Sequence, residues 1–510
     1  MVCSRTFVAG CAAIAALAGL AAPPLSSQAA GPATDGVGLI RNDPGAYQGY
    51  TLLSPLQSTS TFLIDMNGRV VNRWQTDSTP ASLAYLLPNG NLLRGGALTP
   101  SPFGQVAGGG GRIQEFTWDG ELVWDFTYAS ATSIPHHDLI KLPNGNVLLV
   151  VMDRKTPDEA IAAGRIPGSV QGSELHPDGL VEIKPTGRTT GEVVWEWRVW
   201  DHLIQDHDRE KANFGDVAAH PERIDVNFTV VPDRRASPDW THFNAVAYNE
   251  KLDQVAVSLR TFGEIWIIDH STTTKEAAGR TGGRSGKGGD LLYRWGNPRA
   301  YRAGTVADQR LFGQHNVHWI PDGFQGAGHL LIYNNGDTRP DGRYSSVDEI
   351  VPPMDRDGRY TWQPGTRFGP DRPVWSYTAP NKSDFYSVNI SGAMRLPNGN
   401  TLICAGAPGI TFEVTPQGTV VWQYNLPAFT GPGRGGRGAR AGGGAATPRG
   451  GGAGDAGPAG APGRAGAPGR GGAFGNAGRN VFRAYRYGPD YPGLKGKTLT
   501  PGPPLEELAR

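Results

Sequence analysis

The sequence predicts an all-β protein, a six-bladed β-propeller of four-stranded blades closed by a C-terminal strand. Three observations support this prediction. A Pro-Asn-Gly type of turn between two apolar segments recurs along the chain, a second apolar hairpin follows each copy, and no long helix is credible between them. Two hairpins per repeat make a four-stranded sheet, and six such repeats in a row form a ring. An array of β-sandwiches is the alternative, but it does not explain the regular order of the two hairpin types.

The first hairpin type is built on a turn that tolerates the positive φ angles of a tight β-turn, because Asn-Gly adopts them readily. One copy has a longer turn and another has diverged. The five copies are LLPNGNLLRGG (86–96), KLPNGNVLLVV (141–151), AYNEKLDQVAVSLR (247–260), WIPDGFQGAGHLLIYNNG (319–336) and RLPNGNTLICAG (395–406).

The second hairpin type consists of two short strands about a Gly turn, and most copies end in a Trp. The six copies span residues 61–74, 113–126, 180–197, 265–295, 347–377 and 410–424. The first unit has only YTLL (50–53) before this hairpin and lacks a clear first strand. The late segment NVFRAYRYGPD (480–490) has the pattern of such a strand. We therefore expect it to complete the first blade and to close the ring.

The chain is predicted to divide into four parts, since 510 residues exceed one ordinary core. Residues 1–29 have the Arg5, the apolar run and the small residues of a signal peptide, with a membrane anchor as the alternative. Residues 30–427 form the propeller, and residues 480–510 the closing strand and tail. Residues 428–479 are almost entirely Gly, Ala, Pro and Arg, a composition that predicts a disordered insert.

Export to a periplasm or to the medium follows from the signal peptide, without stable membrane insertion after cleavage. Two of the three cysteines, Cys3 and Cys11, leave with that peptide. Only Cys404 remains, so we expect no internal disulfide. The net charge of +1 argues against nucleic acid as a partner, although the insert contains Arg-Gly repeats.

Histidines occupy matching positions just before three of the first strands when the repeats are aligned on their turns. All 11 histidines lie between residues 136 and 329. The first strand of each blade lines the centre of a propeller, so these residues should meet at one mouth of the channel. Arg260 should join them, because the returning strand of its hairpin brings it to the height of His242. The predicted cluster is His136 or His137, His242, Asn244, Arg260 and His315.

Two interpretations of this cluster remain open on chemical grounds. Three neutral histidines can bind a metal, although only Asp138 offers a carboxylate to complete the set. Alternatively, imidazolium and guanidinium groups can hold sulfuryl or phosphoryl oxygens while a neutral histidine attacks as a nucleophile. Adjacent strand residues point to opposite faces, so only one of His136 and His137 should face the channel. Register with His315 favours His137, and register with His242 favours His136.

Three segments resemble motifs of the bacterial arylsulfate sulfotransferases, exported six-bladed propellers that do not use the nucleotide sulfate donor. They are PHHDLIKLPNGNVLLVV, DWTHFNAVAYNEKLDQVAVSLRTFGEIWIID and LFGQHNVHWIPDG, and the resemblance covers about residues 45–427. It implies a transferase that moves a sulfuryl group from a phenolic sulfate ester to a phenol by a ping-pong route, without a metal or another cofactor.

The resemblance also implies roles for individual residues. His315, which follows Gln314, would become transiently sulfated, and His137 or His136 would act as general acid and base. His242, Asn244 and Arg260 would bind sulfate oxygens, and Ser391 would add a hydroxyl donor. The chain lacks the separate N-terminal β domain and the disulfide of the best-known members, which leaves a homodimer open.

Other classes of protein remain as alternatives. One is a different propeller enzyme, such as a quinoprotein dehydrogenase or a metal-dependent lyase. A non-catalytic binding propeller is another, and a sulfatase that uses water as the acceptor is a third.

Overall fold

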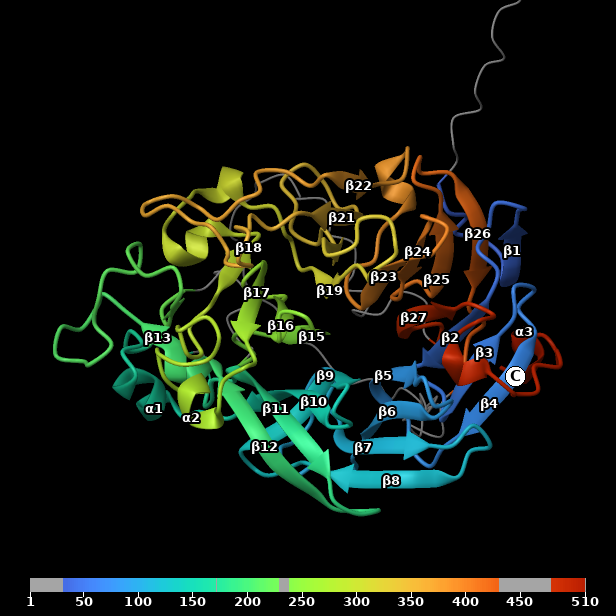
Figure 1. The fold of residues 1–510 in the computed structure, drawn as a ribbon, viewed down its shortest axis with the longest axis horizontal. Coiled ribbons are helices and arrows are strands. Elements are labelled where there is room, and N and C mark those ends of the chain that lie inside the picture. The colour runs from blue at the N-terminus through green and yellow to red at the C-terminus, as the bar shows by residue number, and fades with distance from the viewer. Residues whose placement is uncertain (1–30, 171, 229–237, 431–477, 510) are drawn as a thin grey trace, which may run out of the picture.

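The computed structural model describes residues 31–170, 172–228, 238–430 and 478–509. These residues form a ring of six antiparallel sheets, seen along its short axis in Figure 1. The predicted fold class, a six-bladed β-propeller closed by a C-terminal strand, is confirmed. The predicted signal peptide with Cys3 and Cys11, and most of the predicted insert, lie outside the described residues.

The second to fifth blades each consist of four strands that follow one another from the centre outward. Their bounds are β5(Pro80–Leu86), β6(Leu92–Ala97), β7(Gly111–Phe116) and β8(Leu122–Thr127); β9(Ser133–Lys141), β10(Val147–Asp153), β11(Asp178–Pro185) and β12(Gly191–Arg198); β15(Phe243–Asn249), β16(Gln254–Leu259), β17(Glu264–Asp269) and β18(Tyr293–Trp295); β19(His315–Trp319), β20(Leu330–Asn334), β21(Ser346–Ile350) and β22(Trp375–Tyr377).

The first and sixth blades use strands from both ends of the described chain. The first blade is β27-β2-β3-β4, and the sixth is β23-β24-β25-β26 with β1 as a fifth, outermost strand that the sequence did not predict. Their bounds are β27(Val481–Tyr487), β2(Tyr50–Pro55), β3(Ser60–Ile64) and β4(Val70–Gln75); β23(Ser391–Arg395), β24(Thr401–Ala405), β25(Ile410–Val414), β26(Val420–Asn425) and β1(Gly38–Asn42).

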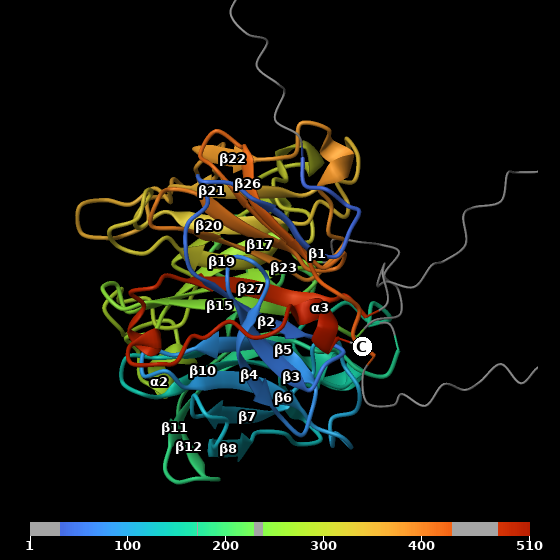
Figure 2. The same cartoon turned by 90° about the vertical axis from the view of Figure 1, so that its right-hand side faces the viewer.

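Ring closure takes place in the first blade. β27 pairs with β2 in antiparallel register, from Tyr50 opposite Tyr487 to Pro55 opposite Val481. Figure 2 shows β27, in red, beside the blue strands of this blade. The innermost strands contact one another around the ring in the order β27, β5, β9, β15, β19, β23 and back to β27. A strand from the C-terminal end of the chain is therefore one of six that surround the centre.

The recurrent Trp of the second hairpin type joins neighbouring blades. It lies on the fourth strand of each blade, counted from the centre, and its indole N–H donates to a backbone carbonyl of the next blade. The six bonds, all 2.7–3.1 Å long, run from Trp74 to Thr117, Trp124 to Thr190, Trp197 to Gly289, Trp295 to Pro370, Trp375 to Pro416 and Trp422 to Met66. The last bond joins the sixth blade to the first, so the motif that repeats along the chain also closes the ring.

The remaining elements are short. They are α1(Pro157–Ala162), α2(Thr274–Ala277) and α3(Leu505–Leu508), the two-stranded pair β13(Leu203–Ile204) and β14(Ile224–Asp225), and five 3-10 turns at Val199–His202, Pro298–Tyr301, Val306–Asp308, Lys382–Asp384 and Pro492–Leu494. No helix in the described part of the chain has the length and apolar character needed to span a membrane.

Irregular backbone marks the beginning of the inner strands. The register of β9, β15 and β19 against their second strands shifts within their first six residues. His137, His242 and Asn316 at this level have φ angles of 57°, 55° and 52°, a left-handed conformation that L residues adopt at a cost. Bulges of this kind re-aim side chains, and they are common beside active sites.

Candidate active site

The structure brings together three of the predicted histidines from three blades. His137 on β9 and His242 before β15 have ring centroids 4.7 Å apart. His315, the first residue of β19, lies close enough to influence the pKa of His137. All three side chains are buried. Residues 178 positions apart in the sequence, from 137 to 315, thus belong to one cluster.

His136 and His137 do not point to opposite faces, contrary to the expectation for adjacent strand residues. Their Nδ1 atoms are 2.6 Å apart and their rings meet nearly at right angles, at 82°. The left-handed backbone of His137 breaks the strand alternation and turns both rings to the same side. His137 lies against His242, whereas His136 lies behind it and is bonded through Nε2 to Asp178 at 2.8 Å.

His315 is held by a hydrogen bond that determines its tautomer. Its Nδ1 lies 2.8 Å from Oδ1 of Asn335, the residue that follows β20. The Asn335 amide donates its own N–H to the carbonyl of Ser387, also at 2.8 Å, which places the oxygen toward the histidine. Since that oxygen can only accept, Nδ1 of His315 carries the proton and Nε2 keeps its lone pair.

Two carboxylates hold His242 and Arg260 in the cluster. Nδ1 of His242 donates to Asp239 in a short hydrogen bond. Arg260 pairs with Asp337 at 3.1 Å, and its backbone N–H donates to the carbonyl of His242. The predicted return of Arg260 to the height of His242 is thus observed. Asp178, Asp239, Asn335 and Asp337 did not enter the predicted cluster.

The predicted substrate-binding residues Asn244, Gln314 and Ser391 are buried, and each donates a hydrogen bond within the protein. The Asn244 amide donates to the carbonyl of Gln314 at 2.8 Å, and Ser391 donates its hydroxyl to Asn335 at 3.2 Å. We expected Gln314 among the substrate-binding residues. Its side-chain nitrogen is instead bonded to the carbonyls of Leu259 and Glu264, which ties β19 to the preceding blade.

The electrostatics of the cluster keep two histidines neutral. Burial lowers the pKa of His137 well below its usual value, and the neighbouring histidines and Arg260 lower it further. Burial and then the charge of Arg260 do the same to the pKa of His315. Burial raises the pKa of the Asp239 carboxyl, but the charge interaction and hydrogen bond with His242 outweigh burial and hold that pKa below its usual value. A neutral Nε2 on His315 beside a guanidinium combines a nucleophile with an anion-binding group.

The closing strand also reaches the cluster, which the sequence analysis did not predict. The ring of Phe482 lies 5.7 Å from that of His137 and 5.9 Å from that of His315. Arg483, the next residue, pairs with Asp138 at 3.0 Å and donates to the carbonyl of Asn244. Asp138 is therefore bound to an arginine rather than completing a set of histidine ligands.

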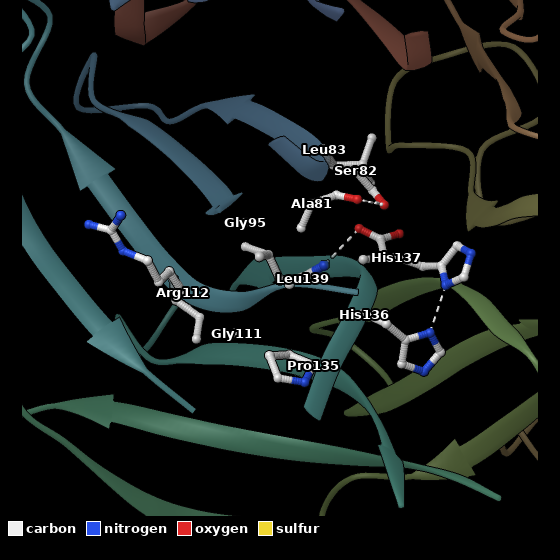
Figure 3. A pocket seen from close by; sticks show the side chains of 13 residues that line it. Ala81, Ser82, Leu83, Gly95, Gly111, Arg112, Pro135, His136, His137 and Leu139 are labelled. Carbon is white, nitrogen blue, oxygen red and sulfur yellow. Dashed lines mark hydrogen bonds between the residues drawn. The ribbon is translucent and has the colours of Figure 1, made fainter. Parts of the chain in front are cut away.

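A small pocket lies beside His136 and His137, between the second and third blades (Figure 3). Small residues such as Ala81, Ser82 and Gly110 form much of its wall. In the described part of the chain, no group of three or more His, Cys, Asp or Glu side chains has the arrangement of a metal site.

The family model described as Arylsulfotransferase (ASST) matches residues 40–426, most of the chain. No curated protein matches the chain.

Several solved structures have a similar course of the chain. A protein of unknown function from Bacteroides caccae is 13% identical over 74% of this chain and 94% of its own, with a TM-score of 0.40. A catalytically inactive virginiamycin B lyase from Staphylococcus aureus, with quinupristin, is 10% identical over 79% and 86%, with a TM-score of 0.33. The β-propeller domain of Cps50 (Swd1) from Myceliophteria thermophila is 10% identical over 79% and 89%, with a TM-score of 0.36. With such TM-scores, none of these likenesses bears on function.

Proposed function

The chain belongs to the arylsulfotransferase family, a family of sulfotransferase enzymes, and on that premise we propose its reaction. It transfers a sulfuryl group from a phenolic sulfate ester to a phenol by a ping-pong route, with His315 as the residue that carries the group. One observation supports this proposal above the others. The bond from Nδ1 of His315 to Asn335 leaves the lone pair on Nε2, within a cluster that contains Arg260 and two further histidines.

In the first half-reaction, Nε2 of His315 attacks the sulfur of the donor. The N–S bond forms as the bond from sulfur to the aryl oxygen breaks, and the aryl oxide leaves with the electron pair. Negative charge develops on the sulfuryl oxygens and on the leaving oxygen. Arg260 and His242 are suited to stabilise it, because hydrogen-bond donors already in place strengthen their bonds as that charge develops.

In the second half-reaction, the oxygen of the acceptor phenol attacks the same sulfur. The N–S bond breaks and its electron pair returns to Nε2 of His315. The hydroxyl proton of the acceptor goes to His137, whose low pKa keeps it neutral and ready to accept. The proton can then pass to the next leaving aryl oxide, so that each cycle balances.

The test is an assay with 4-nitrophenyl sulfate as the donor and a phenol as the acceptor. Wild-type protein should release nitrophenolate in an acceptor-dependent manner and form the sulfated phenol, identified by mass spectrometry. The His315→Asn variant should release none. A wild-type protein that releases no nitrophenolate with any phenol would refute the proposal, and sulfate as the only product would indicate a sulfatase instead.

We further propose that the protein acts after export, in a periplasm or outside the cell, with the aryl sulfate and the phenol as its small-molecule partners. Fractionation of cells that express the full chain, with N-terminal sequencing of the product, tests the export. Sedimentation of the purified protein distinguishes a monomer from a homodimer.

A further inference from the structure

The contact between His136 and His137 requires a single proton between them. Their Nδ1 atoms are 2.6 Å apart, and both side chains are buried. Two bare nitrogens at this distance would repel each other, and so would two N–H groups. One ring therefore donates and the other accepts.

Asp178 decides which ring donates. Its Oδ1 lies 2.8 Å from Nε2 of His136, and neither side chain is exposed to solvent. Its other oxygen, Oδ2, accepts from the hydroxyl of Thr241 at 2.5 Å and from the backbone N–H of Phe243 at 2.7 Å. A carboxylate with these donors is an acceptor only, so Nε2 of His136 carries a proton. Nδ1 of His136 is then the acceptor, and Nδ1 of His137 the donor.

The backbone before β7 packs against one face of the His137 ring. A Cβ atom placed on Gly108 would lie 2.9 Å from three atoms of the His137 ring, so the backbone of Gly108 covers that face. The carbonyl of Gly108 also accepts the backbone N–H of His137 at 3.0 Å. Figure 3 shows the two histidines with the bond between them. The ring cannot rotate to exchange its nitrogens without moving this segment.

We propose that Asp178 and His136 are positioning residues which hold His137 in the tautomer with its lone pair on Nε2. This inference rests on the proposed function, in which His137 takes the hydroxyl proton of the acceptor. When that proton arrives at Nε2, the positive charge is shared through His136 with the Asp178 carboxylate. The arrangement follows the physical logic of an aspartate that orients a catalytic histidine, extended by one imidazole.

The Asp178→Asn variant reverses the relay. Thr241 and Phe243 both donate to the position of Oδ2, so the amide oxygen must occupy it and the amide N–H₂ must face His136. Nε2 of His136 then accepts and its Nδ1 becomes a donor. His137 can accept from that donor only if its own Nδ1 carries no proton. The proton of His137 then lies on Nε2, so Nε2 no longer has the lone pair that acts as the base.

The experiment separates the two half-reactions. In Asp178→Asn, turnover with a weakly acidic phenol should fall by about 10²- to 10⁴-fold, the usual contribution of a general base. The rapid first release of nitrophenolate should persist, because that leaving group needs no proton. A phenol acidic enough to be ionised at the assay pH should restore much of the turnover. Loss of structure alone would reduce both phases equally, and it would not depend on the acidity of the acceptor.

The matched control is Asp290→Asn, which alters another buried His–Asp pair away from the cluster. Asp290 lies 3.1 Å from Nδ1 of His202, whose Nε2 is bonded to a backbone carbonyl. This variant should keep the wild-type ratio of the two phases.

A second pair of variants keeps the inference testable if Asp178→Asn does not fold. His136→Asn retains an acceptor oxygen near the position of Nδ1, and His136→Leu does not. The Asn variant should turn over at least about tenfold faster than the Leu variant with a weakly acidic phenol, within the range of base catalysis.

The outcomes are distinct. A wild-type burst with unchanged turnover in Asp178→Asn overturns the relay and leaves the proposed function intact, as does equal turnover of His136→Asn and His136→Leu with a weakly acidic phenol. If the wild type itself releases no nitrophenolate, the proposed function fails and the relay fails with it.

Discussion

The ion pair between Arg483 and Asp138 connects the closing strand to the third blade, and its removal should be severe. The exposed fraction of the two side chains is 2% and 0%. Their atoms Nη1 and Oδ2 are 3.0 Å apart, and Arg483 also reaches the hydroxyl of Tyr485 and the carbonyl of Asn244. Replacing Arg483 by Met removes the cation and leaves a carboxylate buried without it.

The magnitude follows from what remains around Asp138. Loss of one partner of a buried pair typically costs about 3–5 kcal/mol. Asp138 keeps hydrogen bonds from the hydroxyl of Tyr85 and from two backbone N–H groups, at 2.7–3.1 Å. We therefore expect the lower end of that range, about 3 kcal/mol. Adding Asp138→Asn removes the unpaired charge, so the double variant should recover about 1–2 kcal/mol of the summed losses.

The assay is unfolding in urea, followed by tryptophan fluorescence, for the wild type, both single variants and the double variant. The exposed pair of Lys251 and Asp322, with exposed fractions of 75% and 69%, supplies the control. Lys251→Met should change the free energy of unfolding by at most about 1 kcal/mol. A loss below about 1 kcal/mol in Arg483→Met, or strictly additive losses in the double variant, would refute the reasoning.

Three further predictions concern the same region. A Cβ atom at Gly392 would lie 2.1 Å from Cγ of Arg483, so Gly392→Ala should displace that side chain and destabilise the protein by about 1–3 kcal/mol; an unchanged melting temperature would contradict this. Arg260→Ala should reduce kcat by about 10²- to 10³-fold in the nitrophenyl sulfate assay if its guanidinium acts on the developing charge, and a change in KM alone would argue for simple binding. Because burial lowers the pKa of His137 and of His315 below 6.5, the unfolded chain binds protons below that pH that the folded protein does not. The free energy of unfolding should therefore fall as the pH drops from 6.5 to about 5.5, by about 1 kcal/mol from each histidine. An equal slope for His315→Asn in urea titrations would argue against this.

The contribution of β27 explains why closure of the ring and formation of the site depend on each other. Phe482 lies against His137 and His315, and Arg483 reaches Asp138 and Asn244 on two other blades. The match to the family model ends at residue 426, before this strand. Variants of the last 30 or so residues should therefore affect transfer as well as folding, which the domain division alone would not suggest.

The predicted site was incomplete for a specific reason. Alignment of the turns placed His242 and His315 correctly, because turns and strands have fixed local periods. It did not reveal Asn335, although this residue follows β20 as Arg260 follows β16, so the same alignment continued to the second strands could have found it. The expectation that His136 and His137 point to opposite faces was wrong, since strand alternation does not hold at a bulge.

The sequence alone determined the class of fold, the number of blades, the closing strand and the blades that supply the histidines. These properties depend on local patterns: an Asn-Gly turn, alternation along a strand and a Trp at the end of each unit. The tertiary structure decided which nitrogen of each histidine is free. That depends on Asp178 and Asn335, which lie on or next to another strand of the same blade, and on Asp239, three residues before His242. A period along the chain contains no information about such contacts, because they form between side chains that bulges and left-handed residues re-aim after the strands have paired.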